Sequence, residues 1–159
     1  MPKAHGSPNK AKGDLQCQEL SSEWTGHSHT ALEWAAKEAA VHQVPLTVLT
    51  VHQAVAGFYG SPVSYPGDDA QMQRAREAVG AETDKVLAAL GEGRPASVEV
   101  RVVNGFPAEE LVKAADGAEM VVLGSRGAGG FSRLLMGSVT FQVAQHAHCP
   151  VLIVPPAHS

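Results

Sequence analysis

The stretch Met120-Val-Val-Leu-Gly-Ser-Arg-Gly-Ala-Gly-Gly-Phe-Ser-Arg-Leu-Leu-Met-Gly-Ser-Val-Thr140 joins a short apolar run to a glycine-rich segment and then to the start of a helical pattern. Met120–Leu123 has the unbroken apolar character of a strand that is buried on both faces. Ser138 opens a helical segment that continues to about His146. The order of strand, glycine-rich loop and helix is typical of an α/β protein.

Strands and helices alternate on both sides of this stretch. The apolar spacing, with prolines and glycines at the ends, predicts strands at Leu46–Val51, Ser97–Val103 and Val151–Val154, and helices from Ser28 to before Pro45, from Asp68 to about Leu90, and from Pro107 to Gly117. This alternation predicts an α/β fold with an open, doubly wound parallel sheet and helices on both faces. Ligands of such folds bind beyond the carboxyl ends of the strands, and the glycine-rich loop follows one such end.

Composition and charge point to one globular domain. The chain has 159 residues, of which 44% are hydrophobic and 18% charged, and a net charge of -4. This charge provides no basic surface for nucleic acid, and no apolar run approaches the ~18 residues of a membrane span. Two cysteines make no disulfide framework, which favours a cytoplasmic protein. The polar stretch Met1–Asp14 lacks the apolar core of a secretion signal. Residues 1–16 are interpreted as a mobile tail before a domain at 17–159.

The residue types of the glycine-rich loop favour binding of phosphate. Glycines let the backbone turn with positive φ and approach a ligand closely, so that successive N–H groups converge. The helix that begins near Ser138 adds free N–H groups and the positive end of its dipole. Arg126 adds a charge, and Ser138 and Thr140 add hydroxyl donors. The spacing is neither that of a Walker motif nor that of a dinucleotide fingerprint. The alternative is a turn that needs glycine only for its geometry.

Three motifs also resemble those of a known family. They are Gly124 and Gly127 followed after nine residues by Gly137-Ser138, the segment Ala31–Ala35, and the segment Cys149–Val154. Together they resemble the universal stress protein family over residues 27–155. The resemblance implies a Rossmann-like fold of the adenine nucleotide alpha hydrolase type, with five parallel strands. It also implies ATP binding, for which Mg²⁺ is the default metal.

Carried over by position, the resemblance implies a set of nucleotide contacts. Seven residues would surround the phosphates and ribose: Gly124, Arg126, Gly127, Gly137, Ser138, Val139 and Thr140. Val51, at the end of its strand, would touch the adenine. We assign no catalytic residue and no metal ligand.

The resemblance further implies a homodimer that forms through the last strand. Val151–Val154 would otherwise be an apolar edge strand, which promotes association unless it is paired or covered. We expect a regulatory protein of the stress response, for which ATP is a ligand that biases conformation. Two alternatives stay open, namely an ATP-hydrolysing enzyme and a stress-associated dimer that binds no nucleotide.

The first strand, expected within residues 17–26, departs from the family pattern. The family opens with an apolar strand ending in Asp-Gly-Ser, whose Asp helps to hold adenine or ribose. Here the corresponding stretch is Leu20-Ser-Ser-Glu-Trp-Thr-Gly26, which is polar and lacks Asp. Read out of frame, the junction of the Trp24 and Thr25 codons always encodes Asp, and synonymous choices at the other junctions give Val-Val-Gly-Val-Asp-Gly-Ser. Either these residues are frame-shifted, or the strand is divergent. If the protein lacks the Asp, we expect weaker ATP binding.

Overall fold

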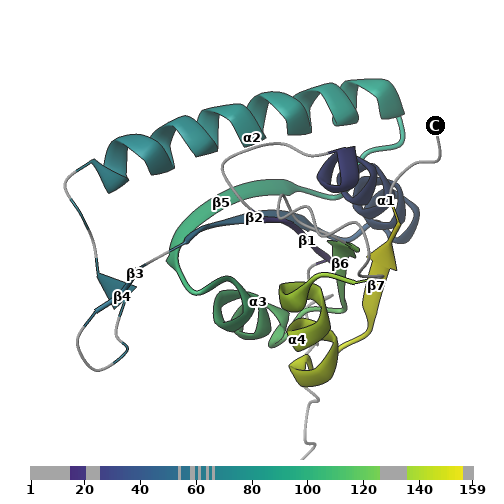
Figure 1. Cartoon of the computed structure of the whole chain (residues 1–159). Coiled ribbons are helices and arrows are strands. Elements are labelled where there is room, and N and C mark those ends of the chain that lie inside the picture. The colour runs from purple at the N-terminus through teal and green to yellow at the C-terminus, as the bar shows by residue number, and fades with distance from the viewer. Residues whose placement is uncertain are drawn as a thin grey trace, which may run out of the picture.

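The computed structural model describes residues 15–20, 26–53, 55–57, 60, 62–63, 65, 67–125 and 136–155. Within these ranges the chain forms an α/β fold in which helices cover both faces of a parallel sheet (Figure 1). The predicted α/β architecture is therefore confirmed.

The main sheet has the strand order β5-β2-β1-β6-β7, and each neighbouring pair is parallel. Its strands are β1 (Leu15–Leu20), β2 (Leu46–Gln53), β5 (Val98–Gly105), β6 (Met120–Gly124) and β7 (Val151–Val154). Between β2 and the next helix, the chain forms a short antiparallel pair, β3 (Val55–Ala56) and β4 (Pro62–Val63).

The helices divide between the two faces of the sheet (Figure 1). One face carries α1 (Gly26–His42) and α2 (Asp68–Leu90), and the other carries α3 (Pro107–Ala115) and α4 (Ser138–His146). Pro107 occupies the first turn of α3, where the helix does not need its missing N–H. These bounds lie within a few residues of those that the sequence predicts.

The position of β1 corrects one prediction. We expected a tail over residues 1–16 and the first strand within residues 17–26, but β1 begins at Leu15 and pairs residue by residue with β2 as far as Leu20. The sequence holds a signal for this placement, because Leu15 and Cys17 alternate with glutamines at the two-residue period of a strand. Residues 21–25, which include most of the atypical stretch, lie outside the described residues.

The core consists of two apolar clusters separated by the sheet. Leu46 and Val48 of β2 belong to the cluster under α1 and α2, whereas Leu49 and Val51 belong to the cluster under α3 and α4. This division follows from the alternation of side chains along a strand. Because β2 is apolar on both sides, helices must cover both faces of the sheet.

None of the described helices combines the length and the apolar character needed to cross a bilayer.

Candidate functional site

The strand order makes the carboxyl ends of β1 and β6 the expected place for a ligand. The chain continues from β1 into α1 on one face, and from β6 into α4 on the opposite face. When two adjacent parallel strands are followed by helices on opposite faces of the sheet, the loops after the two strands diverge. A ligand can then bind between these loops. The glycine-rich loop leaves β6 at this point.

Hydrogen bonds join the two ends of the glycine-rich loop. The Gly137 N–H donates to the Ser125 carbonyl over 2.8 Å, and the Thr140 hydroxyl donates to the Gly124 carbonyl over 3.0 Å. The Ser125 N–H in turn donates to the carbonyl of Val154 in β7 over 2.8 Å. The first turn of α4 is therefore held directly against the end of β6.

Two of the predicted contact residues cannot be placed. Residues 126–135 lie outside the described part of the chain, and they include Arg126 and Gly127. The contacts expected of these two residues stay predictions.

The N-terminus of α4 has backbone donors without helical acceptors. The Phe141 N–H bonds to the Gly137 carbonyl over 2.9 Å and closes the first helical turn. The N–H groups of Ser138, Val139 and Thr140 precede this bond, so the helix supplies no carbonyl for them. At Gly137, the N-cap, no side chain of the described residues makes a capping hydrogen bond. These donors and the positive end of the helix dipole together favour an anion at this place.

The backbone of Gly137 does not have the conformation that we expected of a loop glycine. Its φ of -70° and ψ of 156° are extended values that any residue adopts. Glycine is therefore not required here for a left-handed turn. What it provides instead is the absence of a side chain beside the first N–H groups of α4.

The other predicted residues differ in how exposed they are and in whether their polar groups already make hydrogen bonds. Ser138 is exposed, so its hydroxyl can reach a ligand. Thr140 is 1% exposed and its hydroxyl proton is already donated to Gly124, so Thr140 positions the helix. Val51 is buried in the same apolar cluster as Leu123, and Val139 packs against that cluster. The structure thus brings together all the described members of the predicted set except the adenine contact Val51, which lies two strands away on β2.

Ser125 is a residue of the site that the sequence did not indicate. It is 6% exposed, and its backbone links β7 to Gly137 through one donated and one accepted hydrogen bond. Backbone bonds of this kind can be made by almost any residue type, so the side chain carried no signal for them.

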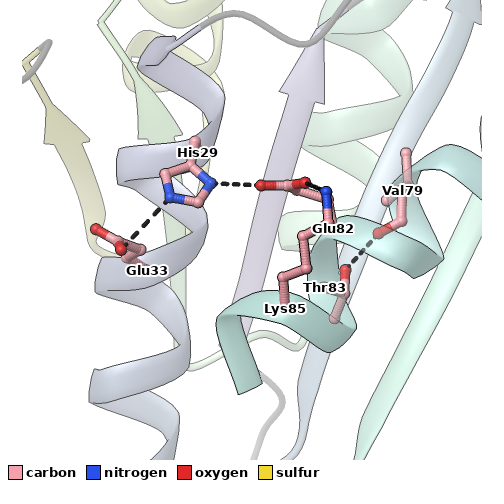
Figure 2. A network of polar contacts seen from close by, with 6 residues as sticks. All are labelled: His29, Glu33, Val79, Glu82, Thr83 and Lys85. Atoms are coloured by element: carbon pink, nitrogen blue, oxygen red, sulfur yellow. Dashed lines mark hydrogen bonds and ion pairs between the residues drawn. The ribbon is translucent and has the colours of Figure 1, made fainter. Parts of the chain in front are cut away.

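A polar network connects α1 to α2, on the face of the sheet that lies opposite α4 (Figure 2). The two ring nitrogens of His29 lie 2.8 Å from a Glu82 oxygen and 3.5 Å from a Glu33 oxygen, and Glu82 also accepts a hydrogen bond from Lys85 over 3.1 Å. The hydrogen bond from Lys85 is the largest cause that lowers the pKa of Glu82, and the bond to His29 adds to it. His29 lies in the first turn of α1, so this network fixes the start of α1 relative to α2.

The last cysteine of the chain lacks the character of a reactive thiol. Burial raises the pKa of the Cys149 thiol and so keeps it protonated. Among the residues that the structure describes, no three His, Cys, Asp or Glu side chains gather into a possible metal site.

The chain is similar to known proteins in sequence over most of its length. The model of the Universal stress protein family matches residues 25–155. A universal stress protein of Mycolicibacterium smegmatis is 30% identical over 131 residues, which are 82% of this chain and 45% of the relative. One of Thermus aquaticus is 32% identical over 137 residues, which are 85% of this chain and 95% of the relative. The chain thus spans about half the length of the mycobacterial relative and nearly the whole of the Thermus one.

Solved structures share the fold at lower sequence identity. UspA from Lactobacillus plantarum has a TM-score of 0.67 at 19% identity, with 90% of this chain and 97% of that chain covered. A universal stress protein in complex with cAMP has a TM-score of 0.61 at 22% identity, with 91% and 99% covered. One from Archaeoglobus fulgidus in complex with dAMP has a TM-score of 0.58 at 20% identity, with 87% and 96% covered. These likenesses support the Rossmann-like α/β fold.

Proposed function

Because this chain belongs to the universal stress protein family, we propose that it is an ATP-binding regulatory protein of the stress response. The observation that carries the proposal is the arrangement at the end of β6, where Gly124 and Gly137 lie beside N–H groups of α4 that have no helical acceptor. Structural neighbours that bind cAMP and dAMP support an adenine nucleotide as the ligand.

The residues at this end of the sheet fit a nucleotide's phosphates. The N–H groups of Ser138, Val139 and Thr140 point to a place where the helix dipole favours negative charge, and the Ser138 hydroxyl adds a donor. Arg126 and Gly127, which lie outside the described residues, would add a charge and further N–H groups. The described residues here provide no carboxylate, so an accompanying Mg²⁺ would be held through the phosphates and water.

The adenine would lie toward Val51. Its strand, β2, ends at the same edge of the sheet as β6, with β1 between them. In this orientation the nucleotide would span the carboxyl ends of three neighbouring strands.

ATP acts in this proposal as a ligand and not as a substrate. Gly124, Ser125 and Gly137–Thr140 contain no carboxylate or imidazole that would act as a general base on water. Binding would therefore shift the protein between conformations or partners. Steady phosphate release that disappears in Ser138→Ala would contradict this view and identify an ATP-hydrolysing enzyme.

The edge strand β7 supports a homodimer. Of the two edges of the sheet, β5 carries the exposed charges Glu99 and Arg101, which oppose pairing with another strand. In contrast, β7 is Val-Leu-Ile-Val and carries no charge. We propose that Val151–Val154 pairs with the same strand of a second copy.

Calorimetric titration with ATP, AMP and cyclic AMP tests the nucleotide proposal. We expect ATP to bind the wild-type chain, and Gly127→Val and Gly137→Val to abolish binding. Because φ and ψ at Gly137 suit any residue, Gly137→Val adds a side chain beside the first N–H groups of α4 without backbone strain. Gly93→Val is the matched control, since Gly93 lies in an exposed turn after α2 and its added Cβ meets only the Leu90 carbonyl at 4.0 Å. A wild-type chain that binds none of the three nucleotides would favour the alternative of a dimer without nucleotide.

A further inference from the structure

A hollow separates the first half of α2 from the carboxyl end of β2. Its volume is 440 Å³. It is lined by Thr50, Val51 and His52 of β2 and by Gln71, Arg74, Ala75 and Ala78 of α2. Figure 1 shows α2 passing over β2 and β5. The hollow therefore lies on the face opposite α4.

The sequence of α2 explains why this space is not filled. Gln71, Arg74, Ala75 and Ala78 are spaced as one face of a helix. In the second half of the helix, the residues that are buried against the protein are Val79, Thr83, Val86 and Leu87. Short alanines replace the bulky apolar side chains in the first half, so the helix leaves a gap over β2.

The hydroxyl of Thr50 is a buried polar group at the hollow. Thr50 is 2% exposed, and its hydroxyl has no hydrogen-bond partner among the described residues. A buried hydroxyl without a partner is uncommon and costs stability. Rotation about χ1 exchanges the hydroxyl and the methyl group of a threonine, so this hydroxyl can turn toward a molecule in the hollow.

The charge at the rim of the hollow is positive. Arg74 is exposed and has no ion pair within the described part of the chain. The nearby carboxylate of Asp68 does not line the hollow. One of its oxygens lies 3.4 Å from His52, and the other accepts the Tyr65 N–H over 2.6 Å. The guanidinium of Arg74 is thus free to bind a carboxylate or a phosphate, for which its fork of donors is suited.

We propose that the hollow between α2 and β2 binds a small organic anion. The apolar body of the ligand lies against Ala75 and Ala78, its anionic group reaches Arg74, and the Thr50 hydroxyl gains a partner. This site is separate from the proposed phosphate site, since it lies across the sheet from α4 and needs none of its N–H groups. Val51 lines the hollow through its main chain, because its side chain is buried in the cluster on the other face of the sheet.

Titration with benzoate, followed by amide chemical shifts of the whole chain, tests the proposal. Benzoate combines an apolar ring with a carboxylate, and benzamide is its neutral counterpart. We expect benzoate to bind about tenfold or more tightly than benzamide, and Arg74→Gln to remove this preference. Arg76→Gln is the matched control, because Arg76 is an exposed arginine of the same helix that does not line the hollow. Equal binding of the two probes, or equal effects of the two variants, would overturn the proposal.

Two further variants separate ligand binding from folding and from the nucleotide site. Thr50→Val removes the unpartnered hydroxyl at nearly constant volume, so we expect an unchanged or higher melting temperature together with weaker benzoate binding. Gly137→Val should abolish ATP binding and leave benzoate binding unchanged. Loss of both ligands in a folded Gly137→Val chain would show that the hollow is part of the nucleotide site, and would refute a separate anion site. Loss of ATP binding alone leaves the anion proposal standing.

Discussion

The hydroxyl of Thr140 donates a hydrogen bond to the carbonyl of Gly124 over 3.0 Å. This bond joins the first turn of α4 to the last residue of β6, on either side of the glycine-rich loop. Together with the bond from Gly137 to Ser125, it fixes the position of the α4 N–H groups that have no helical acceptor. The position of these donors depends on a side chain that itself has no proton left for a ligand.

Thr140→Val should destabilise the protein and weaken ATP binding. The substitution keeps the volume of a side chain that is 1% exposed but removes its hydrogen bond, at a cost of about 1–3 kcal/mol. The loss should also let the start of α4 move relative to β6, so that the phosphate donors are less well placed. Urea unfolding and calorimetric titration with ATP measure the two effects.

Thr83→Val is the control for this substitution. Thr83 is equally buried, at 2% exposed, but its hydroxyl donates to Val79 within α2 over 2.8 Å and links no two elements (Figure 2). It should lower stability less than Thr140→Val and leave ATP affinity unchanged. Equal ATP affinities of the two variants would argue against a positioning role for Thr140.

The network around Glu82 should make stability depend on pH in the acid range. Because the pKa of Glu82 is lowered below 4.5 in the folded protein, ionised Glu82 stabilises the fold above pH 4.5, and this contribution is lost as the pH falls through the folded-state value. The residues of the network are partly exposed, so Glu82→Gln should cost less than about 1 kcal/mol at pH 7. Urea unfolding at pH 7 and at a series of lower pH values should show this difference and its decline as the pH falls below 4.5.

Asp84→Asn serves as the comparison for Glu82→Gln. Asp84 is an exposed carboxylate of the same helix and has no ion pair among the described residues. Its neutralisation should change stability little at either pH. If both variants respond to pH alike, the contacts of Glu82 with Lys85 and His29 do not stabilise the fold.

Ile153→Lys should convert the proposed dimer into a monomer. A lysine on the apolar edge strand β7 opposes its pairing with a second copy, whereas Glu99→Lys changes a residue on the edge that is already charged. Analytical ultracentrifugation should find a dimer for the wild-type chain and for Glu99→Lys, and a monomer for Ile153→Lys. A wild-type monomer at all concentrations would exclude the dimer.

The fold could be predicted well wherever strands and helices carry unbroken local patterns. Val151–Val154 and Met120–Leu123 are short apolar runs between glycines, prolines or turns, and both are strands. The first strand was misplaced because polar residues interrupt it, and its pairing between β2 and β6 depends on contacts distant in sequence. Local periodicity carries no information about such pairing.

The candidate site could be predicted in location but not in detail. Strand, glycines and helix indicated the end of β6, yet the bond from Thr140 to Gly124 joins residues whose closeness results from the folded loop. Likewise, the hollow at Thr50 and Arg74 arises from the packing of α2 over β2, which no motif encodes. The extended backbone at Gly137 also could not be inferred, because glycine is compatible with either sign of φ.

The central claim is that the backbone donors at the start of α4 hold the phosphates of ATP. Amide NMR spectra of the ¹⁵N-labelled chain, recorded during titration with ATP and separately with adenosine, test it directly. We predict that ATP shifts the amide signals of Ser138, Val139 and Thr140 strongly and that adenosine shifts them far less. Saturation with ATP that leaves these three signals in place would contradict the account.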